Sequence, residues 1–166
     1  IPELNELSFD ETGGLTLGAA VPCRRITEDV AVRRHYRALA DVAALIGGVQ
    51  IQSRASLGGN LCNAAPSADG VPLLIACGAV CRIAGPAGSR TVKAEDFCTA
   101  PGRTVLESGE LLVSFQFPPP PPRSGVSYLR FIPRNEMDIA VAGAGVQVVL
   151  EDGHFLHGRI ALSAVA

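Results

Sequence analysis

Five consecutive prolines, Pro118 to Pro122, divide the sequence into two unlike parts. Proline lacks a backbone N–H and cannot pair inside a sheet, so this run must stay extended, at about 3.1 Å per residue. We expect a stiff connector between strands, in preference to a ligand for a proline-reading signalling domain. The residues after the run form three strand-like segments, 126–132, 139–150 and 155–164, whereas those before it mix helical and strand patterns.

The last two of these segments are joined by Glu151-Asp152-Gly153-His154. Asp-Gly favours the positive φ angles of a tight hairpin turn, so this pair predicts an antiparallel hairpin. Further strands are expected before the proline run, at 14–21, 79–83 and 111–117. With two helices beside them, these segments predict an α+β fold with an antiparallel sheet.

The first predicted helix covers residues 27–46, with Thr27 as its N-cap and Gly47-Gly48 as its end. Residues 49–53 are expected to form a short extended run. A second, shorter and buried helix is expected around residues 72–77, because Pro72 is tolerated in a first helical turn.

Composition limits the class of protein. The chain has 166 residues, of which 48% are hydrophobic and 18% charged, which is enough for one domain with a core. The low charge predicts that other chains or domains cover part of its surface. The net charge is −2 and the sequence has no block of Lys and Arg, so it shows no sign of a surface that binds nucleic acid. The apolar runs are too short for a membrane span, and the first residues do not resemble a signal peptide.

The sequence holds five cysteines, without a C-x-x-C pair. We interpret them as buried structural thiols, because the spacing fits neither a zinc site nor an iron–sulfur cluster. Free thiols predict a reducing compartment, the cytoplasm.

One stretch, Ser56 to Asp69 (SLGGNLCNAAPSAD), is unusually rich in small and polar residues, and we expect it to form a loop. Adjacent glycines at 58 and 59 let the backbone approach a ligand, and successive N–H groups in such a turn form an anion site. Asp69 would then suit a ribose diol, or would cap the following helix. The stretch matches neither a Walker loop nor G-x-G-x-x-G. On composition alone, a plain connector and a phosphate site both remain open.

The longer segment IQSRASLGGNLCNAAPSADGVPLLIACGA resembles the second FAD-binding stretch of the molybdenum hydroxylase flavoproteins. These are the medium subunits of carbon monoxide dehydrogenase-like enzymes and the flavin domain of xanthine dehydrogenase. The chain keeps Gly58-Gly59-Asn60-Leu61, Pro66, Asp69 and Pro72 of that pattern, and departs from it at Gln52-Ser53. The segments SRTVKAEDF and YLRFIPRNEMDIAVAGAGVQVVL are also similar to the family, in the family's order.

The resemblance implies the second subdomain of a vanillyl-alcohol-oxidase/xanthine-dehydrogenase type FAD-binding domain. We expect residues 1–166 to be this larger, middle subdomain. An N-terminal subdomain with an AGGT loop and a C-terminal subdomain are expected outside it.

The resemblance also implies roles for single residues. Ser56, Gly58, Gly59 and Asn60 are expected to contact the FAD phosphates and ribityl chain. Asn63 and Asp69 are expected along the phosphate and ribose. No catalytic residue and no metal ligand is assigned.

Three further positions follow from the same resemblance. Ile46 and Leu112 occupy positions that flank the flavin or adenine ring, although by themselves both would be read as core. Asp138 is expected near the isoalloxazine, although with Arg134 it would also be an ordinary surface pair. Some relatives carry a flavin-contacting Lys where this chain has Val141.

The function implied is a FAD-binding electron-transfer module of a molybdenum hydroxylase. The molybdenum cofactor and two [2Fe–2S] clusters are expected on partner subunits or domains, and electrons would leave through FAD to an external acceptor. The alternative is a structural or interaction subdomain that does not hold FAD on its own. A flavoprotein of the enolpyruvyl-glucosamine reductase type fits the later segments less well. The sequence names neither the organic substrate, the electron acceptor nor the oligomeric state.

Overall fold

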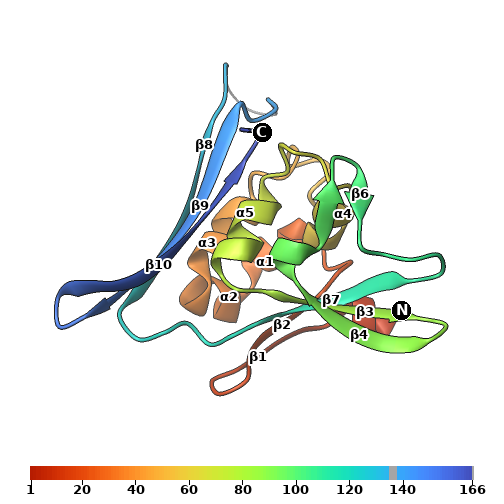
Figure 1. The fold of residues 1–166 in the computed structure, drawn as a ribbon, viewed down its shortest axis with the longest axis horizontal. Helices are drawn as coiled ribbons and strands as arrows, with labels where there is room; N and C mark the ends of the chain where they lie inside the picture. Colours follow the sequence, from red (N-terminus) through yellow and green to blue (C-terminus); the bar gives the residue numbers. More distant parts are fainter. Residues whose placement is uncertain (135–137, 166) are drawn as a thin grey trace.

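The computed structural model describes residues 1–134 and 138–165 (Figure 1). The helices are α1 Cys23–Glu28, α2 Val30–His35, α3 Arg37–Ala43, α4 Leu57–Cys62 and α5 Gly70–Ala76, with 3-10 turns η1 Pro2–Asn5 and η2 Ala94–Asp96. The strands are β1 Leu7–Asp10, β2 Gly14–Gly18, β3 Val80–Gly85, β4 Gly88–Lys93, β5 Cys98–Ala100, β6 Arg103–Thr104, β7 Leu111–Phe117, β8 Ser124–Phe131, β9 Ala142–Glu151 and β10 His154–Ser163. No described helix has the length and hydrophobicity that a membrane crossing needs.

The larger sheet has five strands in the order β1-β2-β7-β3-β4, and every neighbouring pair is antiparallel. Strand β7 is central because its side chains can be buried: Phe115 and Phe117 are fully inaccessible, as are Leu15 and Leu17 on the paired β2. These side chains form the core on which the helices pack. The expected α+β class with antiparallel pairing is therefore confirmed, although the strands divide among separate sheets where one sheet was expected.

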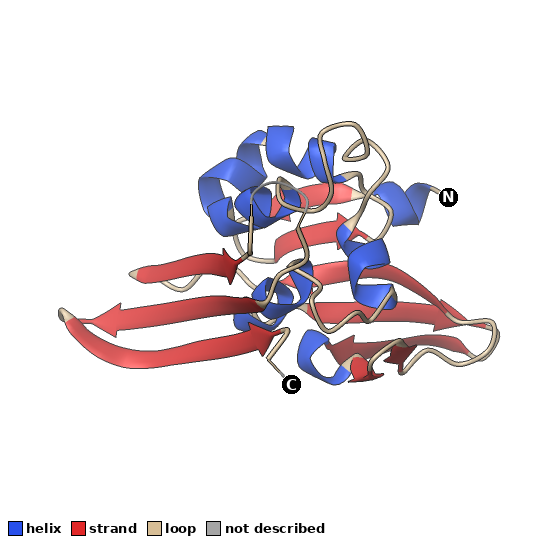
Figure 2. Cartoon of the chain, turned by 90° about the horizontal axis from the view of Figure 1, so that it is seen from above, coloured by secondary structure: helices blue, strands red, loops and turns tan. Residues whose placement is uncertain are grey.

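The second sheet, in the order β10-β9-β8, lies entirely after the prolines. Its predicted hairpin turn is present, with φ of 48° at Asp152 and 81° at Gly153, as the Asp-Gly pair favours. The β9–β10 hairpin extends beyond the helices (Figure 2). Side chains of β8 alternate between half-buried and exposed, so only one face of this sheet is covered.

The helices lie between the two sheets (Figure 1). Helix α5 contacts all three strands of the second sheet and also packs against α3 and α4. Leu73 and Leu74 of α5 are fully buried in the main core. Helix α5 therefore fixes the positions of Asp69, just before it, and of Cys77, just after it.

The proline run forms the connection between the sheets, and no strand includes it. The Tyr36 hydroxyl donates a hydrogen bond to Pro118 O (2.9 Å), and the Ser124 hydroxyl donates one to Pro121 O (2.7 Å). Both ends of the connector are therefore held against the fold. The prediction of a connector between strands is confirmed.

The prediction of one continuous helix over residues 27–46 was wrong. Three short helices, α1 to α3, occupy residues 23–43, and the chain bends between them. Asp29 is extended and accepts a hydrogen bond from Val32 N (2.9 Å), which makes it the N-cap of α2. Thr27 instead donates to Arg24 O within α1. An acidic cap inside the predicted helix explains the break.

Two further local predictions differ from the structure. Residues 49–53 form turns and not an extended run. Strand β1 was not predicted, although it pairs along its whole length with β2. Its side chains alternate only over four residues, which is too short a pattern for a confident strand from sequence.

Candidate functional site

The stretch predicted as a loop begins with a helix. Ser56 is the N-cap of α4: its Oγ accepts a hydrogen bond from Gly59 N (3.0 Å), and its carbonyl accepts one from Asn60 N (3.0 Å). The expectation of a loop over the whole stretch was therefore wrong. The serine N-cap offsets part of the low helix propensity of the two glycines that follow.

The two adjacent glycines have different surroundings. Gly58 is buried, and a Cβ placed on it would lie 2.3 Å from the carbonyl oxygen of Ala19, just beyond β2. Gly59 is exposed, and its nearest neighbour would be Ser56 Oγ at 3.3 Å. Gly58 therefore lacks a side chain because the fold leaves no room for one. Only Gly59 opens the backbone of α4 toward the outside.

Asn60 and Asn63 make different contacts. The Oδ1 atom of Asn60 accepts a hydrogen bond from Gly70 N (2.9 Å), which ties α4 to the start of α5. Asn63 follows α4 as its C-cap and has an exposed side chain. Asn60 thus positions the two helices, whereas the exposed Asn63 side chain, beside Gly59, makes no hydrogen bond to another described residue.

Asp69 sits at the N-cap position of α5 but makes no capping bond with its side chain. Its Oδ1 accepts a hydrogen bond from the Tyr128 hydroxyl (2.7 Å), and its Oδ2 pairs with Arg130 Nη1 (3.0 Å). The Asp69 and Arg130 side chains are only 14% and 10% exposed. Burial and the Asp69 carboxylate raise the pKa of Tyr128, so its hydroxyl stays a donor. The carboxylate therefore joins the helix start to β8, and the expected cap is not formed.

Tyr128 and Arg130 were missed from the sequence. They alternate with exposed residues on β8 and lie on its covered face. Tyr and Arg at alternate positions of a strand were the available signal, since a buried polar group needs a partner. The partner lies about sixty residues earlier in the chain, which the strand pattern by itself does not reveal.

A cavity of about 420 Å³ adjoins the end of this stretch. Residues 64–66 line one side, residues 98–101 another, and residues 162–165 at the end of β10 a third. Ala164 N donates to Pro66 O (2.8 Å), which holds these walls together. Ser163 is buried at this wall, and its side chain interacts with Tyr128. The cavity thus adds space beside the last residues of the glycine–asparagine stretch.

The three remaining predicted positions lie apart from α4 in sequence. Ile46 is half-buried and packs against the core, and Leu112 is 6% exposed on β7. Asp138 accepts hydrogen bonds from the backbone N–H and guanidinium of Arg134. The expected Arg134–Asp138 pair is therefore present, and its carboxylate side chain is 10% exposed.

All five cysteines are free thiols. Cys23 and Cys81 are buried as expected, but Cys62, at the end of α4, is exposed, so the expectation of uniformly buried thiols was wrong there. Burial raises the pKa of Cys23 to about 11 and that of Cys81 to about 12. Within residues 1–134 and 138–165, no three His, Cys, Asp or Glu side chains gather into a possible metal site.

Comparison with known families identifies the first part of the chain. Residues 1–120 match the family model described as the FAD binding domain in molybdopterin dehydrogenase. The chain belongs to this family. The match to the FAD-binding domain ends within the proline run and includes α4, Asp69 and α5.

Curated relatives of this FAD-binding domain extend over both sheets. The xanthine dehydrogenase FAD-binding subunit of Escherichia coli O157:H7 is 36% identical over 167 residues, which cover 100% of this chain and 57% of the relative. The carbon monoxide dehydrogenase medium chain of Afipia carboxidovorans is 35% identical over 127 residues, covering 76% of this chain and 43% of the relative. The chain therefore spans about half the length of these proteins.

Solved structures agree with the sequence relatives. Carbon monoxide dehydrogenase from Hydrogenophaga pseudoflava contains a chain that matches with a TM-score of 0.94 at 32% identity, covering 100% of this chain and 57% of that one. Quinoline 2-oxidoreductase from Pseudomonas putida 86 matches with a TM-score of 0.88 at 33% identity. The FAD-binding domain thus shares its fold with subunits of such oxidoreductases.

Proposed function

We propose that this FAD-binding domain is the electron-transfer module of a molybdenum hydroxylase-type oxidoreductase. It would receive electrons from iron–sulfur clusters on a partner and pass them to an external acceptor. The family match over residues 1–120 carries the proposal. Flavin supplies the redox chemistry when bound, and the protein supplies binding and orientation.

The residues of α4 fit the phosphate part of such a cofactor. Gly59 leaves the outer side of the helix without a side chain, and the exposed Asn63 amide lies one turn further along. Gly58 and Asn60 would act indirectly, by fixing α4 against Ala19 and against α5. Ser56 would hold the first turn of α4 in shape through its bond to Gly59 N.

Asp69 would serve the ribose from a fixed position. A carboxylate can accept more than one hydrogen bond on each oxygen, so the bonds from Tyr128 and Arg130 leave acceptor capacity for a diol. Ile46 and Leu112 would lie beside the rings and Asp138 near the isoalloxazine, as the resemblance implies. These assignments are part of the proposal.

The expected partners are a molybdenum-cofactor subunit and a [2Fe–2S] subunit, in the cytoplasm, together with the remaining flavin subdomains. The outer face of the second sheet supports contact with further protein. Leu129 and Leu162 lie on this face, in register with Ala144 between them, and are 75% and 62% exposed. Apolar side chains gathered in this way are typical of surfaces that become covered.

The test is FAD binding, measured from flavin absorbance at roughly 450 nm after desalting. It is made on the 166-residue chain and on the complete polypeptide, which would also carry the expected flanking flavin subdomains. Gly59→Val places a side chain where the phosphate would lie, and Gly125→Val is the matched control, because its Cβ would have no atom within 4 Å. We expect Gly59→Val to weaken FAD binding about tenfold or more and Gly125→Val to leave it unchanged. If the complete polypeptide holds no flavin, the proposal is wrong.

The alternative, a structural subdomain that does not hold FAD alone, has one observation in its favour. Val141 is 51% exposed at the position where some relatives carry a flavin-contacting Lys, so this chain offers the flavin no cation there. Stoichiometric FAD on the 166-residue chain would exclude this alternative. Binding only by the complete polypeptide would favour it for this segment.

A further inference from the structure

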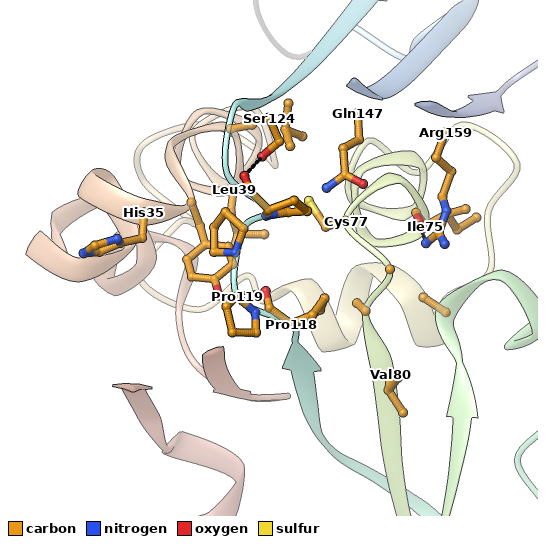
Figure 3. Close-up of a pocket in the computed structure, with 18 of the residues that line it drawn as sticks. His35, Leu39, Ile75, Cys77, Val80, Pro118, Pro119, Ser124, Gln147 and Arg159 are labelled. Atoms are coloured by element: carbon orange, nitrogen blue, oxygen red, sulfur yellow. Dashed lines mark hydrogen bonds between the residues drawn. The ribbon is translucent and has the colours of Figure 1, made fainter. Parts of the chain in front are cut away.

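A second cavity, of about 400 Å³, lies at the opposite end of α5 from Asp69. Figure 3 shows most of the residues that line it. It is bounded by the proline run, by the α2–α3 junction, by the residues after α5, and by the inner face of the second sheet. Its volume is in the range of small-molecule sites. The residues that line it do not include Ser56 to Asp69, so it is separate from the proposed FAD site.

One wall of the cavity is apolar and fixed. Pro118 to Pro121 line it together with Tyr36 and Leu39. The Tyr36 and Ser124 hydroxyls bond the carbonyls of Pro118 and Pro121, so the wall is held at both ends. Extended proline segments pack well against flat aromatic groups, and a preformed wall loses little entropy on binding.

The facing wall is polar and comes from two paired strands. Gln147 on β9 and Arg159 on β10 are direct cross-strand partners, and both line the cavity. Figure 3 shows the Gln147 side chain directed into the cavity. Its side-chain amide makes no hydrogen bond to another described residue. Arg159 Nη1 donates to Ile75 O (3.1 Å), which leaves most of its five N–H donors free.

The charges around the cavity favour an anion. The arginine and lysine residues that line it are Arg34, Arg37, Lys93 and Arg159; His35 also lines it, and Glu95 is its acidic lining residue. Lys93 is paired with Glu95 (3.3 Å), and Arg37 with Asp41 (3.8 Å). Over the described part of the chain, Arg34 and Arg159 have no salt-bridge partner. Burial raises the pKa of Cys77 to about 12, so the thiol between the two walls is neutral and adds no negative charge.

We propose that this cavity binds a small aromatic carboxylate. The carboxylate lies on Arg159 and Gln147, whose donors match its oxygens, and the ring packs on the proline wall. The site is independent of FAD, because it uses none of the residues assigned to the cofactor.

The probe is 2-naphthoate, titrated into the chain by calorimetry, with the isosteric neutral 2-naphthamide as the charge control. We expect naphthoate to bind at millimolar concentration or tighter and naphthamide to bind about tenfold more weakly or worse. Amide shifts in an NMR titration should centre on β9, β10 and the residues after α5. Equal affinity for the two compounds, or shifts elsewhere, would overturn the proposal.

Variants locate the contact. Arg159→Met should weaken naphthoate binding about tenfold or more, and Gln147→Leu by a smaller factor, whereas neither should alter naphthamide binding by as much. Arg24→Met, which removes an exposed arginine on α1, is the matched control and should change nothing. Circular dichroism checks each fold. If Arg159→Met loses its fold, Gln147→Leu decides: unchanged naphthoate affinity in that variant contradicts the assignment.

Discussion

Gly58 provides a sharp test of the site's construction, because the glycine beside it serves as an internal control. A methyl group at Gly58 would lie 2.3 Å from Ala19 O, 2.8 Å from Ala19 C and 2.7 Å from Ala19 Cβ. Two of these atoms belong to the backbone, so α4 or the chain after β2 must move. A methyl group at Gly59 meets only Ser56 Oγ, at 3.3 Å.

The expected magnitudes follow from these contacts. Forcing an extra methyl into a packed site costs roughly 1–3 kcal/mol, and the higher part of that range applies where backbone atoms are the obstacle. Alanine recovers at most about 1 kcal/mol of helix propensity over glycine. We therefore expect Gly58→Ala to lower the free energy of unfolding by about 2 kcal/mol, and Gly59→Ala to leave it unchanged or raise it by up to about 1 kcal/mol.

Urea unfolding followed by circular dichroism measures both variants, with equal m-values as the check on a common unfolded state. In thermal scans, Gly58→Ala should lower Tm by roughly 4–8 °C. Ala19→Gly in the Gly58→Ala background should restore only part of the loss, because the carbonyl oxygen remains. A Gly58→Ala protein as stable as the wild type, or complete rescue by Ala19→Gly, would refute the packing argument.

Three other expectations concern charge and thiols. Asp69→Asn leaves the Arg130 guanidinium without its buried partner and should cost about 3 kcal/mol of stability in urea unfolding; a loss below about 1 kcal/mol would mean that water already screens the pair. Hydrogen bonding from Arg90 lowers the pKa of Glu110 to about 2, so the stabilisation from the ionised Glu110 side chain is present above pH 4.5 and lost as the pH falls toward 2. The free energy of unfolding of Glu110→Gln should therefore depend less steeply on pH over that window than that of the wild type. Parallel pH dependences of the two proteins would contradict this. Cys62, the exposed thiol, should react with a disulfide reagent before the other cysteines, as mass spectrometry of labelled peptides would show.

Local sequence patterns predicted much of the fold. The Asp152-Gly153 turn, the strand ending at Phe117 and the break at the proline run each depend on a few neighbouring residues. Patterns of this kind are visible in sequence because φ restrictions and side-chain alternation act within one element. The same local view failed at Asp29, where a capping carboxylate interrupts a run of good helix formers.

The candidate site was only partly predictable. The sequence marked Ser56 to Asp69 as unusual, and the resemblance gave it a cofactor. It did not show that Ser56 turns the stretch into a helix, nor that the glycine needed for packing is Gly58 while Gly59 faces outward. The need for glycine at position 58 depends on Ala19, which lies some forty residues earlier in the chain.

The sequence by itself determined the α+β class, the stiff connector and the family of this FAD-binding domain, because these follow from local backbone preferences and from a contiguous motif. Only the tertiary structure decided which contacts the motif residues make within the chain. Asp69 bonds Tyr128 and Arg130 on the second sheet, and the proline run becomes one wall of a cavity opposite Arg159. Such contacts join residues far apart in the chain, and their partners are selected by packing and by the need to satisfy buried charge, which no local pattern records.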